Sequence, residues 1–185
     1  MRRLAPRTID QAGWTDWLEL WPQTRIAWGP ESMRLGHGSS ESPAHEASGH
    51  RMNATRQVRH ERVPDHELVI GVRAGDASMA FTLEQLERTG LATAALVGDT
   101  PVVVLHRKER SLAAAFLRTL DDQVLQFVER DGRLVDQDTG SEWDLAGRCT
   151  RGLLAGRTLT RALYSLEEWY VWIAQHPASE LYRAP

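Results

Sequence analysis

Residues 68–81 have the sequence Leu-Val-Ile-Gly-Val-Arg-Ala-Gly-Asp-Ala-Ser-Met-Ala-Phe, and this stretch decides the fold class of the chain. Its two apolar runs, 68–72 and 78–81, have the length of β-strands and flank Ala74-Gly75-Asp76. Glycine and aspartate tolerate the backbone conformation that a tight turn between antiparallel strands requires. The stretch therefore predicts an antiparallel β-hairpin.

The rest of the chain beyond the hairpin continues as short apolar segments separated by turn residues. Residues 82–88 are expected to form a helical turn, and Asp131-Gly132 is a tight-turn dipeptide. Further strands are expected at 101–105, 112–117, 124–128, 133–135, 143–145 and 153–159. The pattern predicts an α+β fold, mainly antiparallel β, as a sheet or partial barrel with two short Trp-bearing helices at the ends.

The two ends of the chain carry the same motif. Trp14-x-x-Trp17 followed by Pro22 returns as Trp169-x-x-Trp172 followed by Pro177, at an offset of 155 residues. Other positions agree at this offset: Arg2 with Arg157, Leu4 with Leu159, Thr24 with Ser179, and Ile26 with Leu181. Tryptophans spaced i, i+3 share one helix face, so both segments are predicted to be short structural helices. We infer an internal repeat, in which the chain opens on the tail of one unit and supplies a second unit.

Local signals predict the limits of these two helices. Asp10 is expected to cap the first helix, and Ser165 with Glu168 to form a capping box ahead of the second. Pro22 and Pro177 are expected to stop them.

The chain divides into a helical tail (1–28), a loop rich in histidine, glycine and serine (29–61) and a β-rich domain (62–185). The loop holds His37, His45 and His50, and imidazoles are ligands for copper, nickel or zinc. Their spacing contains no His-x-His and no i, i+4 pair on a helix, and no thiolate accompanies them. Solvated loop histidines are the alternative interpretation.

The β-rich region resembles a known prokaryotic family. The resemblance rests on residues 138–147 (Asp-Thr-Gly-Ser-x-Trp-x-Leu-x-Gly), on Gly152-x-Leu154-x-Gly156-x-x-Leu159, and on the Trp-x-x-Trp segment through Tyr182. Together with the hairpin and Pro101–Val104, these residues resemble domain of unknown function 3179. The similarity covers about 62–182, and residues 4–26 are similar to the end of the family's first repeat. The resemblance implies an architecture and no particular reaction.

Two segments depart from the family's first-repeat pattern. Many members carry an Asn-Trp-His-Glu-like segment and, after the next apolar strand, a Cys-Pro-Leu-Cys-Gly-like segment. The corresponding stretches here are Gln85-Leu86-Glu87-Arg88 and His106-Arg107-Lys108-Glu109-Arg110. The chain therefore resembles the second, cysteine-free half, and no metal or redox role carries over.

Composition and charge restrict the partners. A net charge of -3 and a pI near 6.2 predict no nucleic-acid binding, and no segment reaches the roughly 18 apolar residues needed for direct membrane insertion. A single cysteine, Cys149, forms no intrachain disulfide. Arg7 and Asp10 interrupt any signal-peptide core after Met1. We expect a cytoplasmic location for the chain as it stands, and an extracytoplasmic one if its N-terminus is truncated.

Three other groups are interpreted as structural. Asp136-x-Asp138-x-Gly140 is a turn, because the twelfth position of the corresponding calcium loop holds Gly147 in place of glutamate. Cys149 is expected to be a small buried thiol. The run Arg107–Arg110 is a charged strand end, with recruitment of an acidic partner as the alternative.

The sequence favours a non-catalytic accessory or protein-interaction domain. It contains no serine-hydrolase elbow, phosphate-binding loop or dinucleotide fingerprint, so no catalytic residue and no resident cofactor are predicted. A metal-binding protein that holds a divalent transition metal through the loop histidines is the first alternative. An enzyme of unknown class is the second.

Calorimetry tests the metal-binding alternative. If His37, His45 and His50 form a site, copper(II) or zinc should bind the full chain saturably, and binding should weaken as the imidazoles protonate below about pH 6.5. Replacing all three histidines with alanine should abolish the heat signal. Saturable binding that persists in this variant would contradict the assignment.

Overall fold

A computed structural model describes residue 8 and residues 12–26, 62–108 and 112–185. Within these ranges the strands are mostly antiparallel, and three short helices accompany them: α1 (Trp14–Leu20), α3 (Leu83–Thr89) and α4 (Trp169–Gln175). The fold is α+β, as the sequence predicts, and the described sheets do not close into a barrel. No helix in these ranges has the length and apolar character to cross a membrane.

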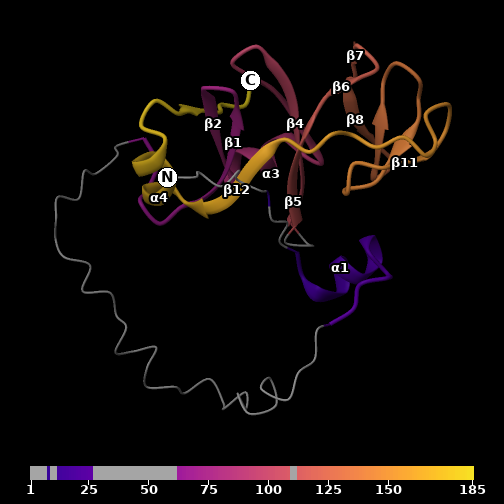
Figure 1. Ribbon diagram of the computed structural model, residues 1–185, viewed down its shortest axis with the longest axis horizontal. Helices are drawn as coiled ribbons and strands as arrows, with labels where there is room; N and C mark the ends of the chain where they lie inside the picture. Colours follow the sequence, from indigo (N-terminus) through magenta and orange to yellow (C-terminus); the bar gives the residue numbers. More distant parts are fainter. Residues whose placement is uncertain (1–7, 9–11, 27–61, 109–111) are drawn as a thin grey trace, which may run out of the picture.

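One four-stranded sheet is built on the predicted hairpin. β1 (Leu68–Ala74) and β2 (Ala77–Thr82) pair antiparallel through a turn in which Gly75 has a φ of 59°. β12 (Leu163–Glu168) pairs with the other edge of β1, and β13 (Glu180–Leu181) runs parallel to β2. α4 follows β12 directly along the chain and lies beside this sheet (Figure 1).

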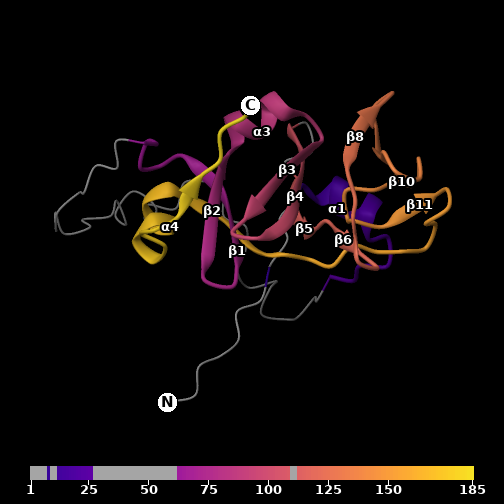
Figure 2. The ribbon, with the colours of Figure 1, turned by 90° about the horizontal axis from the view of Figure 1, so that it is seen from above.

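The remaining strands extend the molecule away from α4. One sheet contains β3 (Ala92–Val97), β4 (Thr100–Arg107) and β5 (Leu112–Leu117). Another has the order β11-β10-β9-β8, with β8 (Phe127–Arg130), β9 (Arg133–Asp136), β10 (Glu142–Trp143) and β11 (Cys149–Arg151). β6 (Thr119–Leu120) and β7 (Gln123–Val124) form a small hairpin. Figures 1 and 2 place the β3–β5 sheet between the α4 end and the β8–β11 end.

Side chains along the hairpin alternate between its two faces, and each face packs into a different hydrophobic core. Ile70, Val72 and Phe81 enter the large hydrophobic cluster that also contains the buried residues of β4 and β5. Val69 and Ala80 project from the opposite face and pack with the indoles of α4. The hairpin is therefore buried on both faces.

The N-terminal capping residues predicted for the two tryptophan-bearing helices are wrong. Ser165 and Glu168 lie in β12, where they pair with Gly71 and Leu68, and α4 begins at Trp169 without a side-chain cap. Pairing with β1 supplies partners for this backbone and so overrides the local helix signal. The N-cap of α1 is Gly13, which has no side-chain oxygen, and not Asp10.

Several strand limits also differ from expectation. The expected strand 124–128 is interrupted, because β7 ends at Val124 and β8 begins at Phe127. Within the expected strand 153–159, residues 153–156 form turns, with Leu153 82% exposed, and Thr158 forms an isolated bridge with Arg148. The Asp131-Gly132 turn is confirmed, with φ values of 51° and 73°. The domain limits at 28 and 61 remain predictions, because residues 27–61 lie outside the described ranges.

Gly71→Ala should destabilise the domain through a single steric conflict. A Cβ built at Gly71 lies 2.2 Å from Cε3 of Trp172. Overpacking of this kind lowers the free energy of unfolding by about 1–3 kcal/mol. Urea denaturation of the wild type and the variant measures this difference. The same substitution in a Trp172→Ala background should cost much less, since the ring is absent. Equal costs in the two backgrounds would contradict this account.

Candidate functional site

The helices α1 and α4 have the same local structure although Figures 1 and 2 show them well apart. Each is preceded by an extended residue, Gly13 with ψ of 147° and Glu168 with ψ of 145°. Each ends in an unusual backbone conformation, at Trp21 with φ -132° and ψ 70° and at His176 with φ -129° and ψ 65°. The match between the terminal motifs therefore extends to the backbone.

The same hydrogen bond closes both segments. The indole Nε1–H of Trp17 donates to the hydroxyl of Thr24 at 2.8 Å. The indole Nε1–H of Trp172 donates to the hydroxyl of Ser179, also at 2.8 Å. In each segment the bond links the helix to a hydroxyl residue seven positions later, after the proline. It therefore fixes the helix and the residues that follow it as one unit.

The sheet covers the indole face of α4. Trp169, Trp172 and Ile173 are almost completely buried against Val69 and Ala80. The His176 ring lies 4.1 Å from the Trp172 ring, and burial lowers the pKa of His176, with Arg73 acting in the same direction and Glu167 opposing it. The face of α4 that carries the tryptophans is thus part of the core.

The helix α1 attaches to the domain through its other face. Leu20 packs with Leu112 of β5 and with Ala146. The guanidinium of Arg148, held by Asp144 at 2.8 Å, donates to the Leu20 carbonyl oxygen, also at 2.8 Å. Gln175 occupies the position in α4 that Leu20 occupies in α1, and it is exposed. Trp21, the C-cap residue of α1, also packs against this cluster. The two helices therefore bury different, partly overlapping faces.

This attachment leaves part of the α1 tryptophan face open. Trp14 is 51% exposed, whereas its counterpart Trp169 is fully buried. Ile26, the counterpart of Leu181, is 60% exposed. Trp17 and Leu18 are half-buried, whereas Trp172 and Ile173 are buried. We call Trp14, Trp17, Leu18 and Ile26 the α1 surface.

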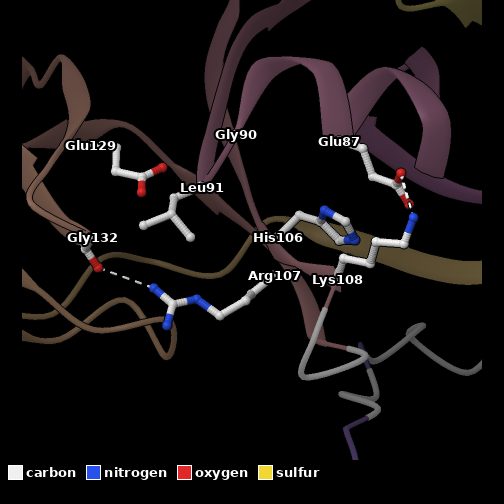
Figure 3. A pocket seen from close by; sticks show the side chains of 8 residues that line it. All are labelled: Glu87, Gly90, Leu91, His106, Arg107, Lys108, Glu129 and Gly132. Carbon is white, nitrogen blue, oxygen red and sulfur yellow. Dashed lines mark hydrogen bonds and ion pairs between the residues drawn. The ribbon is translucent and has the colours of Figure 1, made fainter.

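A second candidate is an open groove of about 610 Å³ between α3, β4 and the β8–β9 turn (Figure 3). Lys108, the only lysine of the chain, forms an ion pair with Glu87 of α3 at 2.8 Å. Arg107 donates to the Gly132 carbonyl oxygen at 3.2 Å. The groove is lined by Glu87, Gly90, Leu91, His106, Arg107, Lys108, Glu129 and Gly132.

The groove lies between the two segments that depart from the family pattern. Its α3 wall contains Glu87, from the stretch 85–88. Its other wall contains His106 and Arg107 of β4 and Lys108, which follows β4. The sequence resemblance places the histidine-bearing and cysteine-bearing segments of other members at these stretches. In this chain the described residues of the two segments lie side by side, and the Lys108–Glu87 ion pair joins them. Sequence reasoning identified both segments and missed that they share a groove.

The predicted metal ligands His37, His45 and His50 lie outside the described residues, so their assignment stays a prediction. Within the described ranges, no group of three histidine, cysteine, aspartate or glutamate side chains is arranged to hold a metal ion.

Cys149 is a buried thiol, as predicted. Its sulfur donates to the Arg151 carbonyl oxygen at 3.4 Å, and burial raises the pKa of the thiol. A raised pKa reduces the thiolate fraction, so this environment does not activate a nucleophile.

Asp136 forms the turn that the sequence predicts in place of a calcium loop. Its carboxylate is fully buried and accepts hydrogen bonds from the Thr139 backbone N–H at 2.7 Å and from the Trp143 indole at 3.0 Å. The Thr139 hydroxyl also donates to both carboxylate oxygens. The oxygens are thus occupied by the turn itself.

Comparison with known proteins gives a family and no activity. The family model described as "Protein of unknown function (DUF3179)" matches residues 2–179. The chain belongs to this family. The family resemblance inferred from the motifs is therefore confirmed. No curated protein and no solved structure matches the chain.

Asp136→Asn should destabilise the protein. The amide keeps the side-chain shape but loses the acceptor capacity of one oxygen, which leaves a buried donor unsatisfied at a cost of about 1–3 kcal/mol. Asp138→Asn, two residues away on an exposed side chain, is the matched control and should change the unfolding free energy by less than about 0.5 kcal/mol. A calcium titration of the wild-type chain that stabilised it through Asp136 would overturn the structural role.

Proposed function

We propose that the protein is a non-catalytic accessory domain that binds another protein through the α1 surface. One observation carries the proposal: α1 reproduces the structure of α4, yet its tryptophan face, which α4 buries, stays partly open. Trp14 and Ile26 are the counterparts of residues that the β1–β2 sheet contacts around α4. A side chain that is buried in one copy of a motif and exposed in the other marks a surface suited to a partner.

The chemistry of this surface suits protein recognition. Burial of a large apolar side chain contributes roughly 1.5–3 kcal/mol, and tryptophan is enriched among the residues that dominate interface energies. The surface is also held in place before binding. Arg148 and Leu20 fix the other face of α1, and the Trp17–Thr24 bond fixes the residues after the helix. Such preorganisation lowers the entropic cost of association.

The groove supports this choice over an enzyme of unknown class. Its lysine is paired with Glu87, and Arg107 is engaged by the Gly132 carbonyl oxygen. The described thiol, Cys149, is not a groove residue and has a raised pKa. The groove residues Lys108 and Arg107 thus already bind other residues of the same chain. The α1 surface, in contrast, has a defined counterpart that shows how it can be covered.

Site-specific crosslinking tests the proposal. A photoreactive amino acid at position 14, in cells that naturally express the protein, should give a discrete protein adduct. The same group at Leu153, which is 82% exposed and belongs to no proposed surface, should give none. Trp17→Ala should remove most of the adduct, because the α1 surface loses its central ring. Equal adducts at positions 14 and 153, or no adduct at 14, would overturn the proposed function.

A further inference from the structure

We infer that the partner covers the α1 surface with a β-hairpin similar to β1–β2. In the complex, α1 would pack on the partner's hairpin as α4 packs on β1–β2 in this chain. The inference rests on the proposed function and specifies the partner class. α4 shows the geometry: Trp172 lies directly over Gly71, and Val69 and Ala80 of the hairpin also pack with the helix. A matching partner presents a hairpin face of small side chains with glycine under the indole of Trp17.

The residues after α1 extend the match to the next strand. At the 155-residue offset, Arg25 and Ile26 correspond to Glu180 and Leu181, which form β13 and pair with Met79 and Ala80 of β2. The Trp17–Thr24 bond holds Thr24 as the Trp172–Ser179 bond holds Ser179. The Trp17–Thr24 bond therefore holds the residue two positions before the exposed Ile26, as the Trp172–Ser179 bond holds the residue two positions before Leu181. A partner hairpin would pair with this segment through the edge of its second strand.

Thr8, which precedes α1, is held against this domain. Thr8 corresponds to Leu163, the first residue of β12, which pairs with β1 and leads directly into α4. The Thr8 hydroxyl donates to the Ala162 carbonyl oxygen at 3.1 Å and accepts from the Tyr164 backbone N–H at 3.3 Å. Thr8 is thus anchored beside the chain that enters α4. Thr8 and Gly13 occupy the sequence positions of the two ends of β12, and residues 9–11 between them lie outside the described ranges.

A second copy of this chain is a poor occupant. The face of its own hairpin that would receive α1 is filled by Trp172, whose ring leaves no space for even a Cβ at Gly71. Its β1 edge is already paired with β12. The structure instead favours a unit of the same architecture whose hairpin has no helix of its own in this place.

A fusion protein tests whether α1 can cover such a hairpin. Residues 62–162 are placed directly before Thr8 of the chain, so that residues 8–26 follow the added copy as 163–181 follow residue 162. If the inference is right, α1 covers the added hairpin and the added copy resists proteolysis. Trp17→Ala should shorten its protease half-life at least about tenfold, because cleavage follows the population of opened molecules. Acrylamide quenching of tryptophan fluorescence should fall on fusion.

Two variants of the added copy sharpen the result. Gly71→Leu in that copy alone should act like Trp17→Ala, because the side chain occupies the position of the indole. Leu153→Ala in that copy is the control and should leave the half-life unchanged. An added copy that is digested equally fast in the unsubstituted fusion and in the Trp17→Ala fusion overturns the inference.

The two proposals fail in different ways. An adduct at position 14 together with an unprotected fusion would keep the proposed function and overturn the hairpin class of partner. A protected fusion without an adduct would support the hairpin class and overturn binding to a separate protein.

Discussion

The contact between the Trp172 indole and the backbone of Gly71 is the constraint on which the β1–β2 sheet depends. Only a residue without a side chain lets the ring lie against the central strand, and the ring in turn seals one face of that strand. The Ser179 hydroxyl then fixes the indole and directs the following residues to the edge of β2 as β13. One indole therefore joins a helix, a strand face and a strand edge, and the other core lies on the far side of the same hairpin.

The sequence predicted the elements that depend on local chemistry and missed those that depend on distant pairing. Turn residues and tryptophan spacing are local signals. They were enough to predict the hairpin at 68–81, the turn at Asp131-Gly132 and the helices at both ends. β12 was not, since Ser165 and Glu168 satisfy a helix-capping pattern while their backbone pairs with a strand almost a hundred residues earlier. β3 was missed for a related reason: its alanine-rich sequence carries weak periodicity, and pairing with β4 defines it.

The candidate sites were predictable to different degrees. The offset between the terminal motifs indicated two similar helices, but nothing local distinguishes a buried tryptophan face from an open one. That difference arises because Leu20 is apolar where Gln175 is polar, which lets α1 attach by its other side. The groove could not be predicted, because it forms where the stretch 85–88 meets residues 106–108, which lie well apart in the sequence. Only the three-dimensional arrangement shows that these two segments, which depart from the family pattern, face each other.

Lys108, which pairs with Glu87, carries the only side-chain amine of the protein. Because no other lysine exists in the chain, any acylation or carbamylation of a side-chain amine falls on the wall of the groove. Loss of that positive charge would remove the ion pair between Glu87 of α3 and the residue that follows β4. A single adduct there would thus alter one defined region of the molecule and leave the tryptophan-bearing ends untouched.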